Sequence, residues 1–261
     1  GVPKEMRQML EGGVLPVVKK LARGEEICRL TLRTTGISES ALFEKLKHLK
    51  EMASVAFLPG YSGVDIRITI RDSRAGERVQ TVAQQIRRLA GDFVYGTEKE
   101  TLEEVVGRQL RESALKLAVA ESCTGGLIAH RLTNIPGSSD YFERGVVTYS
   151  NESKVQLLGI SAETIREYGA VSTQTAEAMA LGVRKLSGTD IGLSITGIAG
   201  PTGATPTKSV GLIYIGFSTP EETISKRLQF GDDRLVNKER MSQAALEMLW
   251  RKLNATTKES Q

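Results

Sequence analysis

A short apolar segment that runs directly into a glycine-rich turn is the feature that most restricts how this chain can fold. The segment is Leu117–Ala120 (LAVA), the turn is ESCTGG at positions 121–126, and helical spacing follows over Leu127–Leu132. A buried strand that passes through glycines into a helix is the repeating unit of layered α/β structure, in which helices cover a sheet. The sequence therefore predicts an α/β domain built around this unit.

The chain on both sides of this unit alternates between strand and helix patterns. Apolar runs predict strands at Gly145–Tyr149, Ile191–Thr196 and Gly211–Phe217, and helical spacing predicts helices at Glu98–Leu115, Ser161–Tyr168, Thr173–Leu186 and Leu235–Leu253. This alternation is typical of a three-layer helix-sheet-helix sandwich. We assign that α/β domain to residues 98–255.

The preceding part of the chain has the pattern of a smaller α+β domain. Its predicted elements are a strand, a helix, two strands and a helix, at Glu26–Gly36, Ser38–Met52, Val55–Leu58, Val64–Ile70 and Glu77–Leu89. We assign this domain to residues 22–97. Residues 1–21 show no sustained periodicity, and we interpret them as the end of a larger upstream unit.

The string Gly60-Tyr61-Ser62-Gly63 in the small domain matches the GxxG loop of RNA-binding KH domains. That loop must join two helices to clamp a nucleic-acid backbone, whereas here it lies between two predicted strands. A hairpin turn that needs the backbone freedom of glycine is the favoured interpretation. The net charge of +4, from 35 basic and 31 acidic residues without a basic block, gives no separate indication of a nucleic-acid partner.

The composition indicates a soluble globular protein. Hydrophobic residues make up 40% of the chain and charged residues 25%, and no apolar run reaches the length of a bilayer span. The first residues lack the pattern of a secretory signal, so we expect a cytoplasmic protein without a membrane partner. Cys28 and Cys123 are the two cysteines, which excludes a disulfide framework and a Cys-rich zinc site.

Ser122 is the first candidate for chemistry, because it stands where the predicted strand turns into a helix. Backbone N–H groups at such a turn point toward one place, and the helix dipole favours negative charge there. The amides of Cys123, Thr124, Gly125 and Gly126 are predicted to hold either a phosphate or the oxyanion of a tetrahedral intermediate. An ordinary structural turn would explain the same string.

A serine nucleophile needs a base, and neither of the two histidines is well placed for that role. His48 lies in the small domain, and His130 falls two turns beyond Ser122 on the predicted helix. A lysine can act as the base if desolvation or a nearby cation keeps it neutral. Lys154 follows a strand end, although a solvated lysine is the simpler interpretation of that residue alone.

Cys123 is a second possible nucleophile, because it adjoins the serine. No histidine or other clear activator lies near it in the sequence, and a thiol without one is a weak nucleophile. We interpret Cys123 as a small buried residue.

Two later segments also have the character of binding loops. Thr196, Gly197, Ile198, Ala199 and Gly200 begin a glycine-rich loop after a predicted strand, which indicates the wall of a pocket. Asp232 and Asp233 precede the last predicted helix, and either one could cap it. Arg234 follows in the first helical turn, where a cation opposes the helix dipole, so an anion-binding or substrate-facing role is indicated.

Taken together, five ordered blocks resemble the C-terminal domain of the CinA family, the nicotinamide-nucleotide amidases also called PncC. The blocks are AESCTGG at 120–126, PGSSDYFERGVVTYSNESK at 136–154, GAVS at 169–172, SITGIAGPTG at 194–203 and Asp233-Arg234. The resemblance implies that Ser122 is the nucleophile and Lys154 its general base, and that Tyr149 and Arg234 assist at the site. Arg234 or Tyr149 is expected either to help keep the lysine deprotonated or to orient it. It also implies hydrolysis of nicotinamide mononucleotide to nicotinic acid mononucleotide and ammonia, with no metal or organic cofactor.

The rest of the chain resembles the upstream parts of the same family. Residues 1–6 resemble the end of its molybdopterin-binding-like domain, and residues 22–95 resemble its KH-type middle domain. We expect the middle domain to be a spacer and oligomerisation element, and the protein to be a homo-oligomer such as a dimer. Ser209 and Asp232 replace a proline and a glycine that the family pattern leads us to expect, which affects the expected shape of the pocket rim.

Two alternatives to the amidase remain at this stage. A nucleotide-binding or regulatory module would keep the pocket without turnover if Lys154 were protonated. An RNA-binding protein would act through the middle domain, although the chain lacks a basic aromatic surface.

Overall fold

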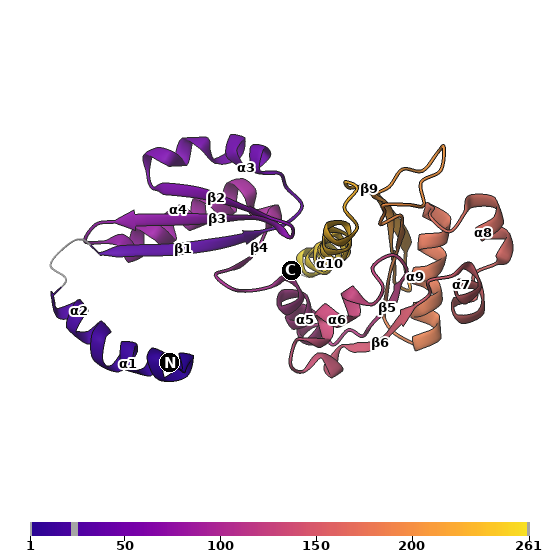
Figure 1. Ribbon diagram of the computed structural model, residues 1–261, viewed down its shortest axis with the longest axis horizontal. Coiled ribbons are helices and arrows are strands. Elements are labelled where there is room, and N and C mark those ends of the chain that lie inside the picture. Colours follow the sequence, from indigo (N-terminus) through magenta and orange to yellow (C-terminus); the bar gives the residue numbers. More distant parts are fainter. Residues whose placement is uncertain (1, 22–25, 260–261) are drawn as a thin grey trace.

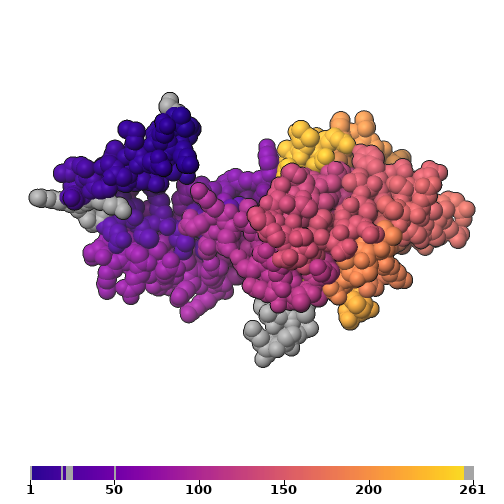
Figure 2. All heavy atoms as spheres, turned by 90° about the horizontal axis from the view of Figure 1, so that it is seen from below, coloured from indigo at the N-terminus to yellow at the C-terminus, as the bar shows by residue number. Residues whose placement is uncertain are grey.

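The computed structural model describes residues 2–21 and 26–259, and these residues form two separate β-sheets with their own helices (Figure 1). The N-terminal segment precedes both sheets and is helical, with α1 at Pro3–Met9, a π-helical turn at Leu10–Val14 and α2 at Leu15–Leu21. In Figures 1 and 2 this segment lies at the end of the molecule away from the C-terminal domain. Its helices were not predicted, because its apolar side chains are exposed and therefore define no buried face.

The small domain is an antiparallel sheet covered by two helices. Its elements are β1 (Ile27–Thr34), α3 (Glu39–Leu46), a 3₁₀ turn (Lys47–Glu51), β2 (Ser54–Gly60), β3 (Gly63–Arg71), α4 (Ala75–Ala90), a 3₁₀ turn (Gly91–Phe93) and β4 (Val94–Thr97). The sheet order is β2-β3-β1-β4. Leu32, Ile66 and Ile68 of the sheet pack with Leu42 and Ile86 of the helices to form its core.

The Gly60–Gly63 string is a hairpin turn, as the sequence indicated. Gly60 pairs with Gly63 across the ends of β2 and β3. Gly63 has φ +147°, and a Cβ atom at this position would collide with the carbonyl oxygen of Thr34. Glycine is required here for the turn, since an L side chain rarely adopts this conformation and has no room.

The larger domain is a mixed five-stranded sheet between two layers of helices. Its strands are β5 (Leu117–Glu121), β6 (Phe142–Val147), β7 (Ile191–Gly197), β8 (Leu212–Ser218) and β9 (Thr223–Gln229), in the order β6-β5-β7-β8-β9. Strands β6, β5 and β7 are parallel, while β8 and β9 run antiparallel to their neighbours. The helices are α5 (Leu102–Glu112), α6 (Leu127–Thr133), α7 (Asn151–Leu158), α8 (Ala162–Tyr168), α9 (Thr173–Ser187) and α10 (Arg234–Glu259), with a 3₁₀ turn at Ser138–Asp140.

The two faces of this sheet carry different helices. Figure 1 shows α5, α6 and α10 on one face and α7, α8 and α9 on the other. Val119, Leu193 and Ile215 of the strands belong to the main apolar core together with Val106 and Leu249 of the helices. The predicted fold class, a three-layer α/β sandwich with a smaller α+β domain, is thus confirmed.

Several element boundaries differ from the prediction for local physical reasons. Helix α5 begins at Leu102 and not at Glu98, because Thr101 forms a capping box with Glu104 and Glu98 has a positive φ of 52°. Strand β4 was not predicted because it is short, and helix α7 was not predicted because its sequence, NESKVQLL, has little amphipathic spacing. Strand β9 was not predicted because it is a half-exposed edge strand that mixes polar and apolar residues.

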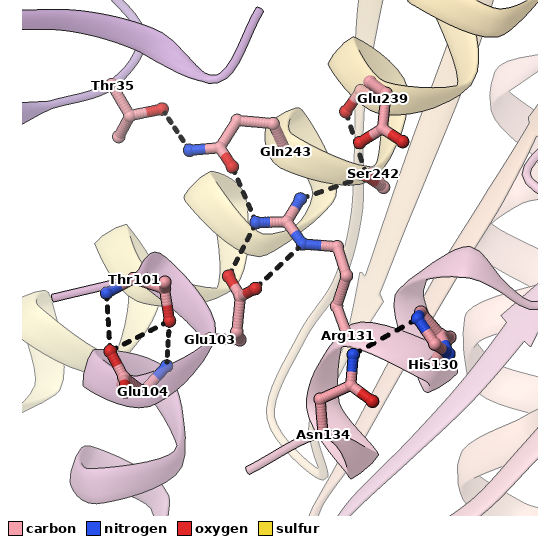
Figure 3. Close-up of polar contacts among 10 residues, drawn as sticks. All are labelled: Thr35, Thr101, Glu103, Glu104, His130, Arg131, Asn134, Glu239, Ser242 and Gln243. Atoms are coloured by element: carbon pink, nitrogen blue, oxygen red, sulfur yellow. Dashed lines mark hydrogen bonds and ion pairs between the residues drawn. The ribbon is translucent and has the colours of Figure 1, made fainter. Parts of the chain in front are cut away.

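Helix α10 joins the two domains through polar and aromatic contacts. Gln243 accepts a hydrogen bond from Arg131 of α6 (2.8 Å) and donates one to Thr35 of the small domain (3.1 Å) (Figure 3). Arg131 also donates to Glu103 of α5 (2.7 Å). Trp250 packs edge-to-face on Tyr95, with ring centroids 6.4 Å apart. A single helix therefore contacts the small domain and forms part of the core of the larger one.

Candidate active site

Ser122 lies at the carboxyl end of β5, in the turn that leads into α6. Its backbone N–H donates to the carbonyl of Ile195 on β7, which holds the turn against the sheet (3.0 Å). Gly125 and Gly126 have φ values of 64° and 96°, so the turn needs glycine at both positions. The Ser122 side chain is 8% exposed. The hydroxyl is thus nearly buried at the edge of the sheet where ligands bind in open α/β folds.

Lys154 lies on α7, the helix that follows β6, and its side chain reaches the Ser122 hydroxyl. Ser150 caps α7 by accepting from the N–H of Ser153, and this places Lys154 in the first turn after β6. Its Nζ atom is 3.1 Å from Ser122 Oγ, 2.7 Å from the Thr148 carbonyl oxygen and 3.3 Å from the Tyr149 carbonyl oxygen. The side chain is only 1% exposed. The simpler interpretation of Lys154 as a solvated lysine is therefore wrong.

Burial shifts the protonation equilibrium of this lysine toward the neutral amine. Desolvation lowers the pKa of Lys154 below its ordinary value, and Cys123 opposes this with a smaller effect. A neutral amine has two N–H donors and one lone pair. The neutral form can donate to the Thr148 and Tyr149 carbonyls and accept from the Ser122 hydroxyl, whereas the charged form would donate to all three oxygens. The expectation that Arg234 or Tyr149 keeps Lys154 deprotonated is not supported, because burial causes the shift.

Cys123 has the properties of a core residue. Its side chain is buried and belongs to the main apolar cluster, although it also touches the cavity described below. Burial raises the pKa of the Cys123 thiol to about 12. The reactive thiolate is therefore almost absent at neutral pH.

We expect replacement of Cys123 by alanine to leave any amide hydrolysis by this protein within a few-fold of wild type, because the thiol has no part in the reaction. Ammonia release with and without prior treatment with iodoacetamide would check this. Loss of turnover in a folded Cys123→Ala variant would identify the thiol as the nucleophile.

Glu121, directly before Ser122, is a residue of the site that the sequence analysis missed. Its carboxylate is 1% exposed and accepts hydrogen bonds from the Thr124 hydroxyl (2.6 Å) and from the N–H groups of Gly126 (3.0 Å), Ile128 (3.1 Å) and Ala129 (2.8 Å). The N-terminus of α6 is thus already bound to an internal anion. This arrangement is favourable for the carboxylate and leaves no room there for a phosphate.

The prediction for the four turn amides must be corrected accordingly. The Gly126 N–H donates to Glu121, and the Gly125 N–H donates to the carbonyl of Ser122 (3.1 Å). Thr124, Gly125 and Gly126 do not line the cavity beside Ser122. Among these four residues Cys123 lines the cavity, so its amide is the one left as a candidate donor to an oxyanion.

A cavity of about 280 Å³ opens beside Ser122 and Lys154. The predicted loop lines it with Thr196, Gly197, Ile198, Ala199 and Gly200. Its other lining residues are Ser122, Cys123, Tyr149, Lys154, Ala170, Val171, Thr202, Gly203 and Arg234. All four residues predicted to be catalytic therefore face one cavity, although they come from separate segments.

Tyr149 and Arg234 lie at the exposed rim of this cavity. Tyr149 is 61% exposed, and its hydroxyl accepts a hydrogen bond from Arg234 Nη2 (3.1 Å). Arg234 Nη1 donates to the Gly200 carbonyl (2.8 Å). Asp233, and not Asp232, caps α10, because its carboxylate accepts from the backbone N–H groups of Leu235 and Val236. The guanidinium thus connects the rim of the cavity to the glycine-rich loop.

Asn237 lies one helical turn beyond Arg234 on α10 and holds the glycine-rich loop that follows β7. Its side chain is 1% exposed and donates to the carbonyls of Ala199 (2.9 Å) and Gly231 (2.8 Å). No sequence signal could have indicated this role, since an asparagine in a helical segment is ordinary without its tertiary contacts. His130 lies outside the cavity and pairs with Asn134, as expected of a structural histidine.

Two features are absent from the described residues. Within residues 2–21 and 26–259, no group of three or more His, Cys, Asp or Glu side chains is arranged to hold a metal ion. No helix in the same ranges is both long enough and apolar enough to cross a bilayer.

These features define a two-domain protein in which an α/β sandwich carries a buried serine–lysine pair at the edge of its sheet. Comparison with known sequences identifies the family. Residues 99–253 match the CinA C-terminal domain, and residues 29–96 match the KH domain of the damage-inducible protein CinA. The chain therefore belongs to the CinA family.

Individual relatives agree with this assignment. A CinA-like protein of Salinibacter ruber is 46% identical over 260 residues, which cover 97% of this chain and 63% of that protein. The chain thus spans less than two thirds of the length of this relative. Among solved structures, a CinA superfamily protein from Klebsiella pneumoniae (30% identity, TM-score 0.57) covers 60% of this chain and is itself covered to 99%. The competence/damage inducible protein CihA from Agrobacterium tumefaciens (38% identity, TM-score 0.55) covers 59% of this chain and is itself covered to 97%.

Proposed function

We propose that the α/β domain hydrolyses the carboxamide of nicotinamide mononucleotide to nicotinic acid mononucleotide and ammonia. The observation that carries this proposal is the contact of 3.1 Å between Ser122 Oγ and the buried Nζ of Lys154. A hydroxyl beside a desolvated amine is the arrangement that serine–lysine acyl transfer requires. The resemblance of the surrounding blocks to nicotinamide-nucleotide amidases selects the substrate.

In the first half of the reaction, neutral Lys154 takes the proton of the Ser122 hydroxyl while Oγ attacks the carboxamide carbon. The negative charge on the carbonyl oxygen is stabilised by the N–H group of Cys123, the residue of the turn after Ser122 that lines the cavity. The protonated lysine then gives its proton to the amide nitrogen. The C–N bond breaks, ammonia leaves and an ester to Ser122 remains.

In the second half, water replaces ammonia in the same geometry. Lys154 takes a proton from water, the resulting hydroxide attacks the ester carbon, and the lysine returns the proton to Ser122 Oγ. Nicotinic acid mononucleotide leaves and the serine is regenerated. A neutral Lys154 also avoids a cation beside the positively charged pyridinium ring of the substrate.

The proposal is tested by incubating the protein with nicotinamide mononucleotide and measuring ammonia and nicotinic acid mononucleotide. We expect the two products in equal amounts, and mass spectrometry of the acid-quenched protein should find the nicotinoyl-nucleotide ester on the peptide that contains Ser122. Binding of the nucleotide without any ammonia release would instead support a non-catalytic nucleotide-binding or regulatory module.

The lowered pKa of Lys154 predicts the direction of the pH dependence. The protonated amine has no lone pair to accept the serine proton, so kcat/KM should rise as the pH increases through the pKa of Lys154 and should level off above it. This acid limb should lie below the ordinary lysine range, because burial disfavours the charged form. A pH profile of initial rates checks the prediction, and a rate that falls across this range would contradict it.

A further inference from the structure

Two cations from the first turns of α10 lie beside the nucleophile turn. Arg234 lines the cavity, and Lys238 follows it by four residues, so both side chains project from the same face of the helix. Helix α10 packs beside α6, the helix that the nucleophile turn leads into (Figure 1). A Cβ atom built on Gly125 would lie 3.6 Å from Lys238 Nζ. The ammonium group of Lys238 therefore sits directly over the Ser122–Gly126 turn.

The environment of Lys238 differs from that of Arg234. The guanidinium of Arg234 is already held by Gly200 and Tyr149, whereas Lys238 Nζ has no hydrogen bond or ion pair within the described parts of the chain. The nearest acidic residue before the helix, Asp233, directs its carboxylate to the backbone N–H groups of α10. Lys238 thus offers three unused N–H donors beside Gly125 of the nucleophile turn, one helical turn beyond Arg234, which lines the cavity.

The N-terminus of α6, where an α/β domain usually binds an anion, is already occupied by a carboxylate of the chain. A strand-to-helix turn normally binds phosphate with the N–H groups of the helix N-terminus. Here the carboxylate of Glu121 takes the amides of Gly126, Ile128 and Ala129. A second anion beside that carboxylate would be repelled, so an anionic part of a ligand must be bound by other groups.

We propose that Lys238, together with Arg234, binds the 5′-phosphate of the nucleotide substrate. The inference rests on the proposed function and specifies which end of the substrate meets which part of the site. The carboxamide and the phosphate are at opposite ends of nicotinamide mononucleotide. Ser122 and Lys154 are nearly buried, whereas Arg234 is exposed at the rim of the cavity. When the carboxamide lies at Ser122, the phosphate at the other end of the substrate therefore lies near the cations of α10.

The test compares ligands with and without the phosphate. The specificity constant kcat/KM is measured for nicotinamide mononucleotide and for nicotinamide riboside, with wild type, Lys238→Met, Lys238→Arg and the control Lys185→Met. Lys185 is an exposed lysine in the last turn of α9. We expect Lys238→Met to lower the ratio of the two constants by about 10- to 100-fold, mainly through KM, because one charge-assisted hydrogen bond to the phosphate is lost. Lys238→Arg should restore most of the ratio, and Lys185→Met should not change it.

A parallel binding measurement separates this inference from the proposed function. The affinities for nicotinic acid mononucleotide and nicotinic acid riboside are measured by calorimetry with the same variants. If the wild type released no ammonia, the amidase proposal would fail, but a loss of nucleotide affinity confined to Lys238→Met would still support the phosphate subsite. An unchanged phosphate preference in Lys238→Met would overturn the subsite, and so would equal weakening of both ligands, which is the result of a purely structural role.

Discussion

Replacement of Ser122 by alanine is expected to reduce ammonia release from nicotinamide mononucleotide by about 10³-fold or more, because the variant has no atom that can form the ester. The fold should remain intact. The Ser122 hydroxyl contacts Lys154, whereas the turn is held by the backbone bond to Ile195 and by the carboxylate of Glu121. The measurements are initial rates of ammonia release and thermal unfolding.

Ser153→Ala is a matched control for this variant. Ser153 lies on α7 next to Lys154, and its hydroxyl donates to the Ser150 carbonyl away from Lys154 Nζ. We expect near wild-type turnover in this control. Turnover in Ser122→Ala close to that of wild type would eliminate Ser122 as the nucleophile and would return attention to Cys123.

Replacement of Lys154 by methionine is the second change with a large expected effect. Methionine fills a similar volume but cannot accept a proton, so we expect kcat to fall by about 10²- to 10⁴-fold with a smaller change in KM. Lys185→Met serves as the control for loss of a lysine. A Lys154→Met variant that retained turnover and the acid limb of the wild-type pH profile would show that another group is the base.

The same variant has an expected signature in stability. Burial lowers the pKa of Lys154 in the folded protein, so between that pKa and the ordinary value the unfolded chain binds more protons than the folded one. The free energy of unfolding of the wild type should therefore rise with pH across this window, and the contribution should be lost as the pH falls through the folded pKa. Lys154→Met should lack this rise, and urea unfolding at several pH values measures the difference.

The sequence predicted that Ser122, Lys154 and the glycine-rich loop each follow a strand, and the sheet order brings these strand ends together. Ser122 and Lys154 follow β5 and β6, which are adjacent parallel strands, and carboxyl ends of parallel strands meet at one edge of a sheet. The glycine-rich loop after β7 lies at the same edge for the same reason. The sequence blocks were assigned to one site through their resemblance to a single family, and the strand order shows why these segments meet.

The parts that depend on tertiary packing could not be predicted. Glu121 could be seen only as a polar residue at the end of a strand, because its hydrogen bonds require the turn to fold its carboxylate over the start of α6. The positions of Asn237 and Lys238 depend on how α10 packs beside α6. Desolvation and a nearby cation were both open as causes of a lowered pKa of Lys154, since burial of a side chain by several elements is not visible in local sequence.

The internal carboxylate of Glu121 has a consequence for the energetics of catalysis. A loop that is shaped by its ligand must lose conformational entropy each time the ligand binds, which weakens binding. The turn that carries Ser122 is instead anchored by an acceptor belonging to the chain itself, so its conformation is established when the domain folds. The attacking oxygen is thus aligned in advance, and binding energy from the rest of the ligand remains available for the reacting bond.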